Sequence, residues 1–199
     1  MIIGKDTIRK ASLDDLEEIF KLYTLYMFDS YLVKMRPTLL KTWLRQLVES
    51  TNCVVLCSVK FKVTGFIVAT LNSKKLYREF LFSKYSFVFL KEFIFSLRIF
   101  KFLVYPFRTY LVDTSAEMLF IVINPEYRNS GIAQRLILRV LKEVGARNVK
   151  KIKVTTVVNN MAVNNLLNKM MFRKEKIFKL LEKDMFLYSC NIANLNYPH

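Results

Sequence analysis

The stretch Ile121–Leu136, with the sequence IVINPEYRNSGIAQRL, decides the fold. Three apolar residues lead into a polar loop, and beyond Gly131 the apolar residues recur at four-residue steps up to Val144. This order predicts a strand, a loop and a helix. The first N–H groups of a helix have no partners inside it and lie at the positive end of its dipole. The stretch therefore suits a diphosphate group at the start of the helix.

The loop residues agree with such a site. Gly131 lets the main chain approach an anion closely, the small Ala133 leaves room two residues later, and Arg128 places a cation at the rim. An ordinary turn between a strand and a helix has the same pattern. By physical chemistry alone, both interpretations stay open.

Outward from this stretch, the hydrophobic pattern predicts further helices and strands. Before it we expect a strand at Thr7–Ala11, a helix from Ser12 to Met27 with a capping box to Asp15, a helix from Pro37, and a hairpin of Cys53–Val59 and Phe66–Leu71. After it we expect a strand at Lys151–Val158, a helix at Met161–Met171 and two strands within Arg173–Ile192, joined near Lys183–Asp184. Helices and strands alternate in the second half, which predicts an α/β fold with a mixed sheet.

Residues 73–115 do not fit this alternation. Thirteen of the 28 aromatic residues lie between Tyr77 and Tyr110, interspersed with Lys and Arg. No uncharged run within 80–107 exceeds six residues, whereas a membrane span needs about 18. We expect an insert of one or two amphipathic helices inside a single domain of residues 1–199.

Composition limits the function classes. Lys and Arg number 32 against 16 Asp and Glu, a formal net charge of +16, which attracts polyanions. A lysine-rich source genome explains the same surplus, and that alternative stays open. One histidine and three cysteines predict neither a metal site nor a histidine-based triad. No signal peptide pattern begins the chain, so we expect a cytoplasmic protein.

The residues Arg128, Gly131 and Ala133, following Asn124-Pro125-Glu126-Tyr127, resemble the acetyl-CoA signature of the GNAT N-acetyltransferases. A second match follows at the expected distance, where Asn160, Ala162, Asn164 and Phe172 resemble the asparagine-led helix of that family and the aromatic residue after it. The resemblance covers most of the chain apart from the insert. It implies a GNAT-like fold and acetyl-CoA as the cosubstrate.

The resemblance also implies roles for single residues. The predicted strand would present its main chain to the pantetheine arm, the loop would hold the diphosphate, and the later helix would contribute two amides. The implied cofactor-binding residues are Ile121, Val122, Ile123, Arg128, Asn129, Ser130, Gly131, Ile132, Ala133, Gln134, Asn160 and Asn164. Helix capping and surface polarity are the alternative for the two asparagines.

The catalytic groups are less clear from the resemblance. Glu117, at the start of the strand, is the candidate base, with a solvated strand end as the alternative. The family's usual acid, a tyrosine of the later helix, corresponds to Leu167, and the family's glycine before the last aromatic residue corresponds to Met171. Another group or water would then protonate the thiolate, or activity would be weak or absent.

The acceptor is predicted as a small-molecule primary amine. The insert resembles insertions in GNAT-like proteins of surface-polysaccharide synthesis, which implies an amino sugar, nucleotide-linked or lipid-linked. A peptide amine and a non-catalytic acyl-CoA-binding or regulatory module are the alternatives. No recognised nucleic-acid-binding motif occurs, so we expect no nucleic-acid partner. For the insert, a lid or homodimer contact and a peripheral membrane contact both stay open.

Overall fold

The computed structural model describes residues 6–27, 30, 33, 36–82, 114, 116–180 and 182–194. Seven strands form one mixed sheet in the order β1-β2-β3-β4-β5-β7-β6. They are β1 (Thr7–Lys10), β2 (Cys53–Val59), β3 (Val63–Thr70), β4 (Glu117–Ile123), β5 (Lys151–Val157), β6 (Arg173–Leu180) and β7 (Lys183–Asn191). All neighbours are antiparallel except β4 and β5, which are parallel. The predicted α/β fold with a mixed sheet is confirmed.

The described helices fall close to the predicted positions. They are α1 (Leu16–Tyr26), α2 (Pro37–Glu49), α3 (Ser73–Leu81), α6 (Ile132–Gly145) and α7 (Met161–Lys169), with short 3₁₀ turns at Leu13–Asp15, Pro125–Tyr127 and Ile192–Asn194. The capping turn before α1 forms as expected, because the Ser12 N–H donates to the Asp15 carboxylate over 2.8 Å. Pro37 is the first residue of α2, where its missing N–H costs nothing.

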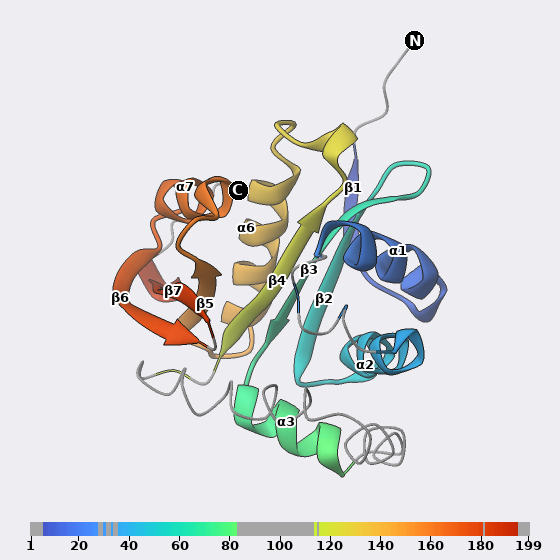
Figure 1. Ribbon diagram of the computed structural model, residues 1–199, viewed down its shortest axis with the longest axis horizontal. Helices are drawn as coiled ribbons and strands as arrows, with labels where there is room; N and C mark the ends of the chain where they lie inside the picture. Colours follow the sequence, from blue (N-terminus) through green and yellow to red (C-terminus); the bar gives the residue numbers. More distant parts are fainter. Residues whose placement is uncertain are drawn as a thin grey trace.

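The helices cover both faces of the sheet. α1 and α2 pack on one face, with Leu76 and Phe80 of α3 in the same apolar cluster, whereas α6 and α7 pack on the other face. Figure 1 shows α1 and α2 on one side of the strands and α6 on the other. We call these the α1–α2 face and the α6–α7 face. The sheet is therefore the middle layer of three.

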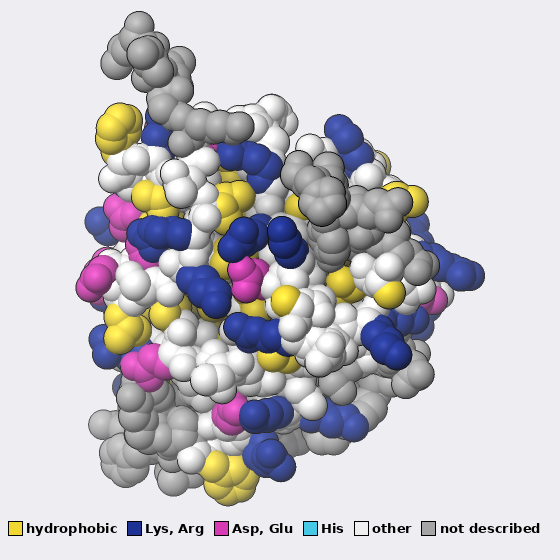
Figure 2. Space-filling view, turned by 180° about the vertical axis from the view of Figure 1, so that it is seen from behind, with side chains coloured by type: hydrophobic (Ala, Val, Ile, Leu, Met, Phe, Trp, Pro, Cys, Tyr) yellow, Lys and Arg dark blue, Asp and Glu magenta, His cyan; other side chains and the backbone are white. Residues whose placement is uncertain are grey.

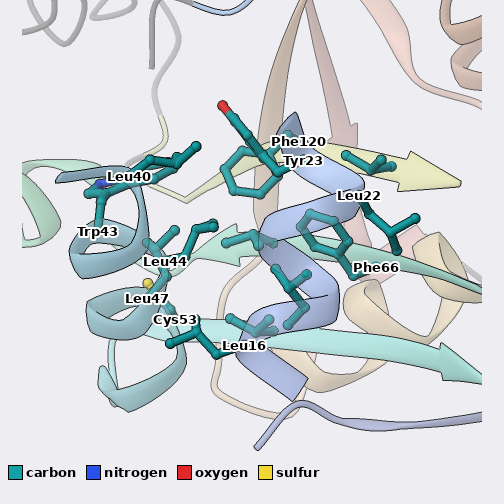
Figure 3. Close-up of a cluster of buried hydrophobic side chains, with 14 of the residues drawn as sticks. Leu16, Leu22, Tyr23, Leu40, Trp43, Leu44, Leu47, Cys53, Phe66 and Phe120 are labelled. Carbon is teal, nitrogen blue, oxygen red and sulfur yellow. The ribbon is translucent and has the colours of Figure 1, made fainter. Parts of the chain in front are cut away.

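Phe120 of β4 is the centre of the core on the α1–α2 face. Its ring lies 5.0 Å from that of Tyr23, 5.5 Å from Trp43 and 5.8 Å from Phe66, measured between ring centroids. Figure 3 shows these rings meeting between α1, α2 and the sheet. Aromatic pairs at such distances add stability beyond the area they bury. β4 is therefore held firmly from the α1–α2 side.

A β-bulge in β4 decides which side chains face which layer. Phe120 pairs with Val68 and Met118 pairs with Ala69, so Leu119 is the extra residue. Beyond the bulge the alternation is reversed. Phe120 and Val122 therefore pack with α1 and α2, while Ile121 and Ile123 pack with the α6–α7 cluster.

Three boundaries differ from the sequence prediction. β3 begins at Val63 rather than Phe66, because the residues after Lys62 pair with β2 across a tighter turn. The β6–β7 connection lies before Lys183, which pairs with Leu180. α3 supplies a helix at the start of the predicted insert, and the predicted helices from 83 onward lie outside the described residues. No described helix has the length and apolar character needed to cross a membrane.

Candidate active site

β4 and β5 separate soon after they begin. Their parallel pairing comprises Glu117 with Lys153 and Met118 with Val154, and from Thr155 onward β5 pairs with β7 alone. Figure 1 shows the two strands diverging along their length. We call the diverging parts, Leu119–Ile123 of β4 and Thr155–Val157 of β5, the fork. Among the described residues, no strand pairs with the β5 side of β4 in the fork, so its main chain can bind an extended ligand there.

The open end of the fork leads into the start of α6. Gly131 is the residue before this helix and has a φ of +79°, while Asn129 has a φ of +60°. Both residues adopt the left-handed conformation, which asparagine and above all glycine tolerate. A Cβ atom placed on Gly131 would meet no heavy atom within 4 Å. The main chain at Gly131 is therefore open to a ligand.

The first turn of α6 offers main-chain donors beside this space. Its intrahelical hydrogen bonds begin when the Arg135 N–H donates to the Gly131 carbonyl over 3.1 Å. The N–H groups of Ile132, Ala133 and Gln134 precede that bond and so have no acceptor within the helix. Asn129 and Ser130 are exposed just before them. These donors, at the positive end of a 14-residue helix, suit a diphosphate.

Arg128 closes the rim of this cradle, which comprises residues 128–134. Its Nε donates to the Ile123 carbonyl over 3.2 Å, and its guanidinium carbon lies 5.8 Å from the centre of the Tyr26 ring. The side chain is exposed, so the rest of the guanidinium keeps its charge toward solvent. Arg128 thus links the end of β4 to α1 and places a cation beside the cradle.

The closed end of the fork contains a buried pair of opposite charges. Glu117 Oε2 and Lys153 Nζ are 4.0 Å apart, and the two side chains are only 1% and 4% exposed. The two residues are partners in the parallel register. Glu117 is thus not a solvated strand end but a buried carboxylate one residue from the point where β4 and β5 part.

Two residues of α3, Lys74 and Tyr77, interact electrostatically with this pair. Burial raises the pKa of the Tyr77 phenol well above its usual value, and the negative charge of Glu117 adds to the rise. Burial lowers the pKa of Lys153, Glu117 opposes that change, and Lys74 adds to the lowering. The start of β4 is therefore a site where a carboxylate, a lysine and a tyrosine influence one another.

Two asparagines of α7 have structural partners. The Asn160 side chain accepts from the Val163 N–H over 3.3 Å and so caps the helix. Asn164 is 5% exposed, and its Nδ2 donates to the carbonyls of Val157 and Val158 over 3.2 and 2.9 Å. Asn164 thereby ties α7 to the end of β5, at the outer edge of the fork. Contact of either residue with a cofactor stays a prediction.

The chain matches the family model described as the acetyltransferase (GNAT) family over residues 16–172. It belongs to the GNAT acetyltransferase family. The protein is an N-acetyltransferase that depends on acetyl-CoA, the cosubstrate of this family. No curated protein sequence matches the chain.

Solved structures have the same fold as this GNAT acetyltransferase. An N-acetyltransferase from Staphylococcus aureus is 15% identical, with a TM-score of 0.63 over 95% of this chain and 99% of that one. NAA60 from Arabidopsis thaliana, in complex with acetyl-CoA, is 16% identical, with a TM-score of 0.63 over 96% and 100%. The NatC complex bound to Gag peptide and CoA has a chain that is 15% identical, with a TM-score of 0.61 over 94% and 99%.

The sequence-predicted site residues of the acetyltransferase lie in four places. The cradle lies at one end of β4, Glu117 lies at the other end, and Ile121, Val122 and Ile123 lie along the strand between them. From Met118 to Ile123 the strand advances about 17 Å. Asn160 and Asn164 lie across the fork on α7. Leu167, where the family has its tyrosine, is fully buried in the apolar cluster of the α6–α7 face.

Lys153 is the main residue that the sequence did not indicate. It stands in Lys151-Ile152-Lys153-Val154, where alternation with apolar residues predicts a solvated lysine. It is buried because Glu117 lies beside it on β4, 36 positions earlier in the chain. No local signal distinguishes a lysine paired in this way from an exposed one.

Proposed function

We propose that this acetyltransferase acetylates the primary amine of a small, negatively charged acceptor, with a nucleotide-linked amino sugar as the chemical class. The observation that carries the proposal is the fork itself. It joins the cradle, whose main-chain N–H groups suit a diphosphate, to a buried carboxylate at the other end of the same strand. One extended cosubstrate would occupy both.

The cradle and the fork fit acetyl-CoA by their donors. Residues Asn129–Gln134 would hold the diphosphate through main-chain N–H groups, and the free edge of β4 would bind the amide-containing arm. The bound cosubstrate supplies an acetyl group activated as a thioester. At the closed end, Glu117 would accept a proton from the acceptor amine, directly or through water, so that the amine is neutral when it reacts.

The charge distribution favours an anionic acceptor. Lys74 lies close enough to Lys153 to influence its pKa, so among the described residues two lysines lie near Glu117 at the closed end. The chain as a whole carries a formal +16, and Figure 2 shows Lys and Arg outnumbering Asp and Glu on the molecular face opposite that of Figure 1. A polycationic amine would be repelled, whereas a phosphate-bearing amine would be attracted.

A panel of acceptors tests this proposal. Purified protein is incubated with acetyl-CoA and, in turn, with nucleotide-linked amino sugars, free amino sugars, peptides and polyamines, and release of the free thiol is followed. We expect the highest kcat/KM with a nucleotide-linked amino sugar, and a loss of that preference at high salt because charge attraction is screened. A preference for polyamines contradicts the proposal.

A peptide amine is the second candidate. The likeness in fold to the NatC complex bound to Gag peptide and CoA favours it. In the same panel, acetylation of peptide N-termini ahead of every sugar would replace the amino-sugar acceptor with this one. Binding of acetyl-CoA without thiol release in the presence of any amine would instead support a non-catalytic acyl-CoA-binding module.

A further inference from the structure

The buried pair of Glu117 and Lys153 has a geometry that the proposed reaction can use. A buried carboxylate without a cation loses its hydration and tends to take up a proton. Here the Lys153 Nζ lies 4.0 Å from Glu117 Oε2, and both side chains are at least 96% buried. The short parallel ladder fixes this arrangement, because Lys153 N–H also donates to the Ala116 carbonyl over 3.0 Å.

We propose that Lys153 is a positioning residue for acetyl transfer, whose ammonium keeps the Glu117 carboxylate ionised and therefore able to accept the proton of the acceptor amine. The proposal rests on the proposed function, in which Glu117 is the base. It assigns to Lys153 no contact with the acceptor or with acetyl-CoA. A base that is protonated at neutral pH would be inactive, so the lysine sets the pH at which the enzyme begins to work.

The sheet neighbours of the pair are uncharged residues. On β3, Glu117 lies beside Thr70, which is neutral and bonded to Asn52. On β7, Lys153 lies beside Ser189, which donates to the Glu175 carboxylate of β6. Neither neighbour offers Glu117 a cation.

α3 supplies the remaining titratable neighbours. Tyr77 is neutral at physiological pH, because burial and Glu117 both raise its pKa. Lys74 is exposed, and its positive charge adds to the lowering of the Lys153 pKa. The cation that the structure places at an ion-pair distance from Glu117 in the interior is Lys153, at 4.0 Å.

The pair is mutually dependent. Burial lowers the pKa of Lys153, and the negative charge of Glu117 counteracts it. Each charge of the pair thus favours the charged form of the other. Replacement of Lys153 by an uncharged side chain of similar length should leave the fork in place and remove only the cation.

The first test measures the ionisation of Glu117 directly, in the protein without substrates. Glutamate labelled with ¹³C at the carboxyl carbon is titrated by NMR, and the Glu117 resonance is assigned by its absence from Glu117→Gln. In Lys153→Met we expect its titration midpoint to rise by about one pH unit or more. In Lys153→Arg the midpoint should stay near that of the wild type. An unchanged midpoint in Lys153→Met overturns the proposal.

Lys151→Met is the matched control. Lys151 lies two residues earlier on the same side of β5, but its Nζ is 3.5 Å from Glu175 and its side chain is 31% exposed. Its loss should leave the Glu117 midpoint unchanged. If Lys153→Met does not fold, as judged by circular dichroism, Lys153→Gln takes its place in the titration.

The second test is the pH dependence of kcat/KM. In Lys153→Met the acid limb should move to higher pH by the same amount as the NMR midpoint, with the KM for acetyl-CoA unchanged. A raised NMR midpoint with an unmoved acid limb would show that Lys153 controls Glu117 but that Glu117 is not the base. That outcome rejects Glu117 as the base of the proposed function. An unchanged NMR midpoint rejects only the positioning role of Lys153.

Discussion

The two ends of β4 carry different kinds of candidate site, one built from main-chain groups and the other from side chains. At the Ile123 end, the cradle uses main-chain N–H groups and the left-handed conformation of Gly131, and it is open to solvent. At the Glu117 end, two charged side chains from neighbouring strands meet in the interior. The first site depends on backbone conformation, and the second depends on which strands lie side by side.

This contrast indicates how each end should respond to substitution. A change in the cradle should weaken binding of the cosubstrate and leave the chemistry of bound molecules intact. A change at the closed end should lower the rate and leave cosubstrate binding intact. Four predictions follow this division, beginning with the largest expected effect.

Glu117→Gln should abolish most of the activity by removing the carboxylate at the closed end of the fork. Loss of the proposed base should reduce kcat/KM by about 10²- to 10⁴-fold, while the dissociation constant for CoA, measured by calorimetry, stays unchanged. Glu126→Gln is the control, because Glu126 is exposed in the loop at the opposite end of β4. If Glu117→Gln has the kcat of the wild type, Glu117 is not the base.

Gly131→Ala should weaken binding of the cosubstrate at the open end of the fork. The new Cβ would occupy the space beside the first N–H groups of α6, so we expect CoA affinity to fall about tenfold, or about 1.4 kcal/mol. The positive φ should also lower the free energy of unfolding by about 1–2 kcal/mol.

Gly65→Ala provides the comparison for that experiment. Its Cβ would lie 2.6 Å from Ile123 Cδ1 and 2.9 Å from the Val122 carbonyl oxygen. Crowding against β4 should cost about 1–3 kcal/mol of stability, seen in chemical denaturation. If Gly65→Ala reduces CoA affinity more than Gly131→Ala does, the cradle is not the main anchor of the cosubstrate.

Asn164→Ala and Asn160→Ala test whether the two asparagines of α7 have a structural role alone or also bind the cofactor. Loss of the Asn164 amide removes the side-chain donor to the Val158 carbonyl and one of the two donors to the Val157 carbonyl, at a cost of about 1–3 kcal/mol in stability. Loss of the Asn160 cap should cost about 1 kcal/mol. Thermal unfolding measures both changes. A fall in CoA affinity, measured with the folded variants, would give the asparagine concerned the predicted role at the cofactor.

Tyr188→Phe should have the smallest effect. Tyr188 is fully buried on β7, and its hydroxyl has no hydrogen-bond partner among the described residues. Its removal should leave the free energy of unfolding unchanged or raise it by about 1 kcal/mol. A clear loss of stability would reveal a partner for this hydroxyl. A loss of acetyl transfer alone would indicate that Tyr188 protonates the thiolate, the role for which the family's tyrosine is replaced by Leu167.

Much of the fold, and the backbone conformation of the proposed cradle, could be predicted from local patterns. The helix after Gly131 and the strand before it follow from apolar spacing, and the signature residues Arg128, Gly131 and Ala133 led to the family that the comparison found. These features depend on residues close together in the chain. Backbone conformation and helix ends are local properties.

The closed end could not be predicted in this way. Glu117 was a candidate base, but its burial and its partner Lys153 depend on the parallel contact between β4 and β5. The reversal of side-chain direction at Leu119 likewise arises from the pairing of β4 with β3. Both are long-range contacts, for which the sequence carries no local signal.

By itself, then, the sequence determined a strand, a glycine-containing loop and a helix start able to bind an anion, because these require only neighbouring residues. Only the tertiary structure decided where β4 and β5 part and that a lysine lies beside Glu117 at that point. The physical reason is that a buried charge is stabilised by a partner in space, and a partner in space need not be near in the sequence.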